Sequence, residues 1–120
     1  MTVIIELKKV EQADLNLFKK VLNDYTEILQ MLVETLQDIK YSKEMSIAIE
    51  AWYEFNKKTT AQFPPKETLI KLSLHKAYVL NDALQEYAKN CDNSYEKSKC
   101  NRFVMAIDQQ FPTATQLAIK

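Results

Sequence analysis

Glycine is absent from this chain of 120 residues. Average usage of about 7% would place roughly eight glycines in a chain of this length, so the deficit is informative. Glycine supplies the left-handed turns of hairpins, the bulges of sheets and the loops that cradle phosphates. Its absence predicts helices joined by short polar turns. It also excludes the glycine-rich fingerprints of dinucleotide and nucleoside-triphosphate sites and the nucleophile elbow of α/β-hydrolases.

Arginine is nearly absent, and the chain has no net charge. Sixteen basic residues balance 16 acidic ones, and Arg102 is the single arginine. A neutral chain exerts no overall attraction on nucleic acid or anionic lipid. Because arginine is the preferred residue for bidentate phosphate recognition, its scarcity weighs against a phosphate-reading surface. The lysine-rich, glycine-free composition is typical of an AT-rich coding sequence, which predicts a bacterial or phage source.

Histidine and cysteine are also scarce. His75 is the only histidine, and the two cysteines, Cys91 and Cys100, lack the CxxC spacing of zinc sites. We therefore expect no metal site and no cofactor. Two free thiols in a reducing compartment are predicted, with a disulfide between neighbouring helices as the alternative. No apolar run approaches the roughly eighteen residues of a membrane helix, and no signal peptide is visible, so we expect a cytoplasmic protein.

A strict apolar periodicity predicts a long first helix. Asp14 is a plausible N-cap, and the helix is expected to run to about Lys40. The spacings alternate between three and four residues, as in a coiled coil, but further apolar residues widen the stripe and favour packing in a bundle. The periodic residues are Leu15, Phe18, Leu22, Tyr25, Leu29, Leu32, Leu36 and Ile39, widened by Leu17, Val21, Ile28 and Met31.

A second helix is predicted from Lys43 to Thr60, with Ser42 as its cap. Its polar residues form one narrow stripe, and the remaining circumference is largely apolar. Such a helix is either central in the fold or buried in an interface. Two consecutive prolines, Pro64 and Pro65, cannot continue a helix and end this half of the chain. The polar stripe consists of Lys43, Ser46, Glu50, Glu54 and Lys57.

The second half of the chain predicts two shorter helices, Leu74 to Asn90 after a Ser73 cap and Tyr95 to Phe111 before Pro112. Asn or Asp is expected to take a left-handed position in the turn between them. Residues 113–120 are predicted to be a short tail. We expect an all-α fold, a four-helix bundle forming a single domain over residues 1–120. A small two-stranded ribbon between residues 3–7 and 69–72 is a possible addition.

An interaction protein is the first functional hypothesis. The second predicted helix has apolar residues on more sides than one neighbour can cover, and large aromatic residues anchor many protein interfaces. We expect a non-enzymatic adaptor, inhibitor or complex subunit that binds a protein partner or itself, with a homodimer as one form. The competing interpretation is that these aromatic residues fill the core. The interface candidates are Trp52, Tyr53, Phe55 and Phe63.

A nucleic-acid-associated accessory subunit is the alternative hypothesis. Nine basic residues face five acidic ones between Lys57 and Arg102, with tyrosines among them. Basic side chains beside stacking aromatics are typical of proteins that bind single strands. The same tyrosines also suit the edge of a core. The candidates on the two later helices and the strand before them are Lys71, Lys76, Lys89, Lys97, Lys99 and Arg102.

No assembled catalytic group is apparent, and we expect no enzymatic activity. The best candidate pair is His75 with Asp82, which helical rise places about 10.5 Å apart along the axis, too far for a direct hydrogen bond. Seven acidic residues between Val21 and Asn56 flank the apolar stripes. Because a di-iron bundle needs two Glu-x-x-His motifs, we interpret these acidic residues as a solvated face.

Overall fold

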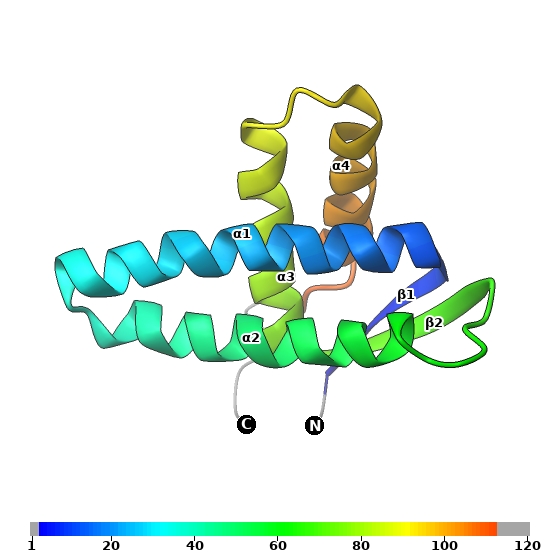
Figure 1. Ribbon diagram of the computed structural model, residues 1–120, viewed down its shortest axis with the longest axis horizontal. Helices are drawn as coiled ribbons and strands as arrows, with labels where there is room; N and C mark the ends of the chain where they lie inside the picture. Colours follow the sequence, from blue (N-terminus) through cyan, green and yellow to red (C-terminus); the bar gives the residue numbers. More distant parts are fainter. Residues whose placement is uncertain (1–2, 113–120) are drawn as a thin grey trace.

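The computed structural model describes residues 3–112, which form a mostly helical fold with one two-stranded antiparallel sheet (Figure 1). Two helices follow the first strand, and two more follow the second. This order confirms the predicted helices and the predicted ribbon. The predicted tail at 113–120 lies outside the described residues. The elements are β1 (Ile4–Glu11), α1 (Gln12–Leu36), α2 (Ile39–Thr59), β2 (Glu67–Ser73), α3 (Leu74–Lys89) and α4 (Ser94–Asp108).

The first long helix ends earlier than its periodicity predicts. Gln37 has φ 53° and ψ 33°, a left-handed conformation, and its N–H donates to the Val33 carbonyl oxygen. Asp38 then caps α2, because its side chain accepts a hydrogen bond from the Lys40 N–H. The predictions that helix one reaches Lys40 and that Ser42 caps helix two were therefore wrong. A two-residue turn without glycine makes α1 and α2 an antiparallel hairpin.

The start of α1 also differs in its cap. Glu11 is the N-cap, and Asp14 occupies the third helical position, where its side chain accepts from the Glu11 N–H at 3.0 Å. This is a reciprocal capping box. The predicted cap at Asp14 was therefore wrong by three residues, although its side chain does stabilise the first turn.

The two-stranded ribbon has the predicted partners. Ile5 lies opposite Leu72 and Leu7 opposite Ile70, which confirms the pairing of residues 3–7 with 69–72. The register shifts between Leu7 and Val10, where Lys9 has φ 55°. A bulge with a left-handed residue at this point lets β1 continue to Glu11 and lead directly into α1.

The second helical hairpin crosses the first. Figure 1 shows α3 and α4 side by side, running across the direction of α1 and α2. The parallel alignment of a four-helix bundle is therefore not confirmed. Ser73 caps α3 as predicted, but α4 ends at Asp108 rather than Phe111. Asn90 has φ −110°, so the predicted left-handed Asn at the α3–α4 turn is wrong there; in the described residues this conformation occurs at Lys9 and Gln37.

The core lies where the two hairpins and the sheet meet. Phe18 of α1 is fully buried, with its ring centroid 5.3 Å from that of Phe55 on α2 and 4.8 Å from that of Phe103 on α4. Inward residues of the ribbon, Ile5 and Leu72 among them, join the same cluster. The sheet and all four helices thus share one core. The outer faces of the helices are exposed and could contact other molecules.

Candidate functional site

The outward face of α2 is the side of the helix opposite its buried residues, and we define it as Ile39, Ser42, Ser46, Ile49 and Tyr53. All five are exposed, while Ala48, Ala51 and Phe55 on the other side are buried. Ile39 is 71% exposed, Tyr53 57% and Ile49 40%. Residues at spacings of three and four share one helix face. The outward face therefore combines large apolar side chains with two small serines.

Trp52 forms the border between this face and α1. Its ring is half-buried and meets the Tyr53 ring edge to face at 5.1 Å between centroids. The Lys19 Nζ lies 5.4 Å from the centroid of the Trp52 ring, within the range of a cation–π interaction. A shallow depression of about 280 Å³ separates Trp52 and Ile49 from Asn23 and Thr26 of α1. The aromatic pair is thus held in place beside a surface hollow.

The four aromatic interface candidates do not lie together. Trp52 and Tyr53 contact each other, but Phe55 is 1% exposed and packs against Phe18, so it is a core residue. Phe63 is 85% exposed in the segment between α2 and β2 and makes no ring contact within residues 3–112. Ile39 and Ile49 were missed as candidates, because the sequence pattern assigned Ile39 to the first helix and gave no reason to expect Ile49 outside.

Three of the six nucleic-acid candidates are paired with carboxylates. Lys99 Nζ lies 3.3 Å from Asp14 Oδ1, and Lys89 Nζ lies 3.5 Å from Glu86 Oε2. Lys76 pairs with both Glu50 and Glu54; burial lowers the pKa of Lys76, but these two hydrogen-bonded carboxylates outweigh it and raise the pKa overall.

The other three nucleic-acid candidates are exposed. Lys71 lies on β2, while Lys97 and Arg102 lie on α4. The six residues are therefore distributed over one strand and both ends of the second helical hairpin, and half of them have a carboxylate partner.

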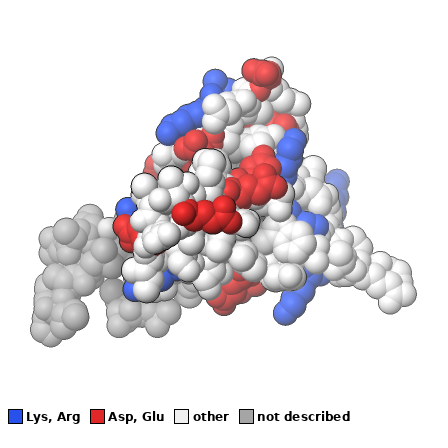
Figure 2. Space-filling model, turned by 60° about the vertical axis from the view of Figure 1, so that its left-hand side comes forward, with Lys and Arg blue, Asp and Glu red and all other residues white. Residues whose placement is uncertain are grey.

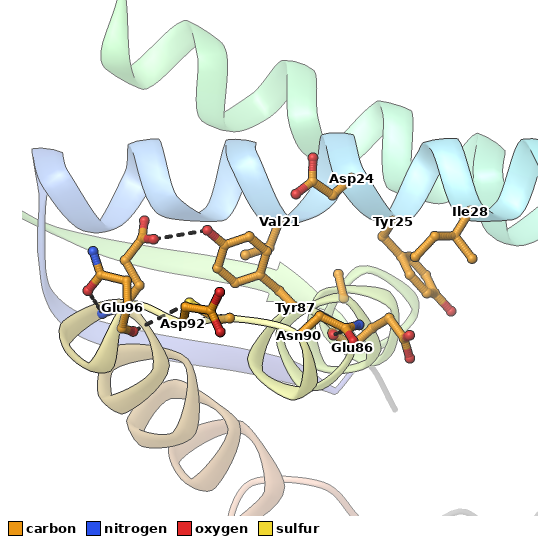
Figure 3. A pocket seen from close by; sticks show the side chains of 12 residues that line it. Val21, Asp24, Tyr25, Ile28, Glu86, Tyr87, Asn90, Asp92 and Glu96 are labelled. Atoms are coloured by element: carbon orange, nitrogen blue, oxygen red, sulfur yellow. Dashed lines mark hydrogen bonds between the residues drawn. The ribbon is translucent and has the colours of Figure 1, made fainter.

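A pocket of about 320 Å³ opens between α1, α3 and the α3–α4 turn (Figure 3). Apolar walls come from Val21, Ile28 and Ala83, and two tyrosines, Tyr25 and Tyr87, line it as well. The sequence gave no means of finding this pocket, because its walls belong to segments far apart in the chain and meet only where α3 crosses α1. Four carboxylates also line it, from Asp24, Glu86, Asp92 and Glu96.

The electrostatics of this pocket are dominated by its carboxylates. The Tyr87 hydroxyl donates to Glu96 Oε1 at 2.9 Å, and Lys20 at the border lies 3.3 Å from Glu96 Oε2. Tyr87 and Glu96 together raise the pKa of Lys20, which keeps this ion pair charged. Among residues 3–112, none of those that line the pocket is basic. Such a wall repels anions and tolerates a cationic or neutral polar group.

Acidic side chains also gather toward the turn end of the α1–α2 hairpin. Figure 2, with this end turned forward, shows red atoms grouped in the middle of the view and blue atoms mainly at its borders. Glu44 at this end accepts a hydrogen bond from the Tyr25 hydroxyl at 3.1 Å, and burial together with Glu44 raises the pKa of Tyr25. Within residues 3–112, no group of three Asp, Glu, His or Cys residues is placed to hold a metal ion.

His75, Asp82 and the two cysteines lie on α3, on α4 and in the turn between them, away from the outward face of α2. His75 and Asp82 are both exposed on α3. Cys91 and Cys100 are free thiols, the first half-buried beside the pocket and the second fully buried. None of the described helices is long and apolar enough to cross a membrane.

Comparison with protein families, with curated proteins and with solved structures finds no significant match.

Proposed function

We propose that this protein is a non-catalytic interaction protein that binds another protein molecule through the outward face of α2. The observation that carries this proposal is the exposure of Ile39 and Tyr53, at 71% and 57%, on one continuous helical stripe. Burying large apolar side chains in an interface is favourable by about 25 cal/mol for each Å² removed from water. Tyrosine and tryptophan also rank among the residues that contribute most to binding.

The arrangement around Tyr53 supports an anchoring role. The Trp52 ring packs against it, and the Lys19 Nζ lies 5.4 Å from the centroid of the tryptophan ring. A side chain held by its neighbours loses little conformational freedom on binding, which favours affinity. The outward face also lies on a helix whose opposite side is packed firmly into the core. A rigid helix with an exposed apolar stripe is a common docking element in protein recognition.

The nucleic-acid alternative stays a prediction, and we advance no second function. Ion pairing of Lys76, Lys89 and Lys99 with carboxylates reduces the positive charge available to phosphates on the second hairpin.

Site-specific photo-crosslinking tests the proposed function. A benzoylphenylalanine placed at Tyr53 should give a defined crosslinked protein adduct when cells producing the protein are irradiated. The matched control carries the same group at Asn101, an exposed position on α4. We expect a strong adduct from position 53 and little from position 101. Equal adduct formation at both positions, or none at position 53, would contradict the proposal.

A further inference from the structure

We infer that the occupant of this face is a second copy of the same chain, paired through an antiparallel contact between the two α2 helices. This inference rests on the proposed function and names its partner. In a two-fold symmetric pair, the same surface must complement itself. Three features of the outward face meet this condition: its central residue is small, its ends carry apolar groups of complementary size, and its flank carries charges of opposite sign.

The apolar residues match when Ser46 lies on the two-fold axis. Ile39 and Tyr53 are each seven residues from Ser46, on opposite sides, so they are equally distant from the axis along the helix. In the antiparallel pair Ile39 of one copy therefore lies level with Tyr53 of the other. Ser42 and Ser46 present small side chains between these contacts and allow the two helix backbones to approach closely. The stripe has the alternating spacing of three and four residues that two packed helices share.

The charges match in the same arrangement. Lys43 and Glu50 are both exposed, and their spacing of seven residues places them on one flank of the stripe. The two-fold axis sets Lys43 of one copy beside Glu50 of the other, twice in each dimer. Glu50 binds Lys76 through Oε1 at 3.4 Å, and its side chain remains 66% exposed. This self-complementary charge pattern favours a second copy over an unrelated partner.

Charge reversal across the dimer tests this inference. Sedimentation equilibrium should show that the unmodified protein dimerises reversibly, and that Lys43→Glu or Glu50→Lys alone weakens the dimer by at least fivefold. Each single reversal places like charges together at two symmetric positions. An equimolar mixture of the two variants should form a heterodimer at least as tight as the original dimer. In this heterodimer, each of the two contacts between positions 43 and 50 again joins one acidic and one basic side chain. Lys97→Glu on α4 serves as the control and should leave dimerisation unchanged.

A substitution that only destabilises the fold of one variant cannot make the two variants associate more tightly. Tighter association in the mixture therefore reports restored charge pairing. Failure of the mixture to associate better than either variant would overturn the antiparallel pairing. A strictly monomeric protein at several hundred micromolar would overturn the homodimer itself. If a monomeric protein still gave a specific adduct with a different protein from position 53, the proposed function would stand and this inference alone would fail.

Discussion

Asp14 illustrates how a single residue connects distant elements. Its carboxylate is 4% exposed, accepts from the Glu11 N–H and pairs with Lys99 at 3.3 Å. One side chain thereby completes the cap of α1 and attaches α4 to it. The sequence predicted Asp14 as the N-cap of the first helix, and it offered Lys99 only as a nucleic-acid candidate. The spacing of residues along the sequence can reveal a capping residue. Its ion pair with Lys99 cannot be predicted in this way, because it forms only where α4 packs beside the start of α1.

Cys100 gives a residue-scale prediction for pH. Burial raises the pKa of its thiol from an ordinary value of 9.0 to about 11. Between these values the folded chain retains a proton that the unfolded chain releases. The free energy of unfolding should therefore fall as the pH rises from about 9 to about 11. Relative to Cys100→Ala, the unmodified protein should lose about 1–2 kcal/mol across this interval. Urea denaturation at several pH values measures this difference, and a constant difference would contradict the prediction.

Among the elements, α2 shows where sequence prediction succeeds and where it fails. Its existence and its largely apolar circumference were predictable, but the side facing the core was not. Phe55 was an interface candidate and is buried, whereas Ile49 was unremarked and is exposed. A helix that is apolar on several sides offers more than one possible inward face. The way in which α1 and α3 pack against α2 decides which of its faces turns inward, and this packing cannot be predicted from the sequence of α2 alone.

The α1–α2 turn gives an element-scale prediction. Gln37 adopts the left-handed conformation, with φ 53°, that is unfavourable for residues with a Cβ atom. Gln37→Gly should raise the free energy of unfolding by about 1 kcal/mol. Glu27→Gly, at an exposed position inside α1, is the matched control and should lower it by about 1 kcal/mol. Thermal or urea unfolding of both variants checks this. A loss of stability in Gln37→Gly would show that the turn does not favour glycine.

At the scale of the whole molecule, two helical hairpins cross each other and share one core with a small sheet. The four helices and the pairing of the two ribbon segments followed from apolar patterns, capping residues and prolines, but the residue register of the ribbon did not. The crossing of the hairpins did not follow, because it depends on contacts such as Phe18 with Phe103, 85 residues apart in the chain. The acidic pocket was unpredictable for the same reason, since its walls meet only at that crossing.

In the proposed dimer, two copies meet across the outward face of α2 with Ser46 at the two-fold axis. A symmetric disulfide forms when the two Cα atoms approach to roughly 4.4–6.8 Å, a distance that a close antiparallel pair provides at its axis. The most direct measurement is oxidative crosslinking of Ser46→Cys in a Cys91→Ser background, compared with Asn101→Cys in the same background. We expect a disulfide-linked dimer from position 46, formed at least tenfold faster than from position 101. Equal rates at the two positions, or no dimer from position 46, would contradict the proposed dimer.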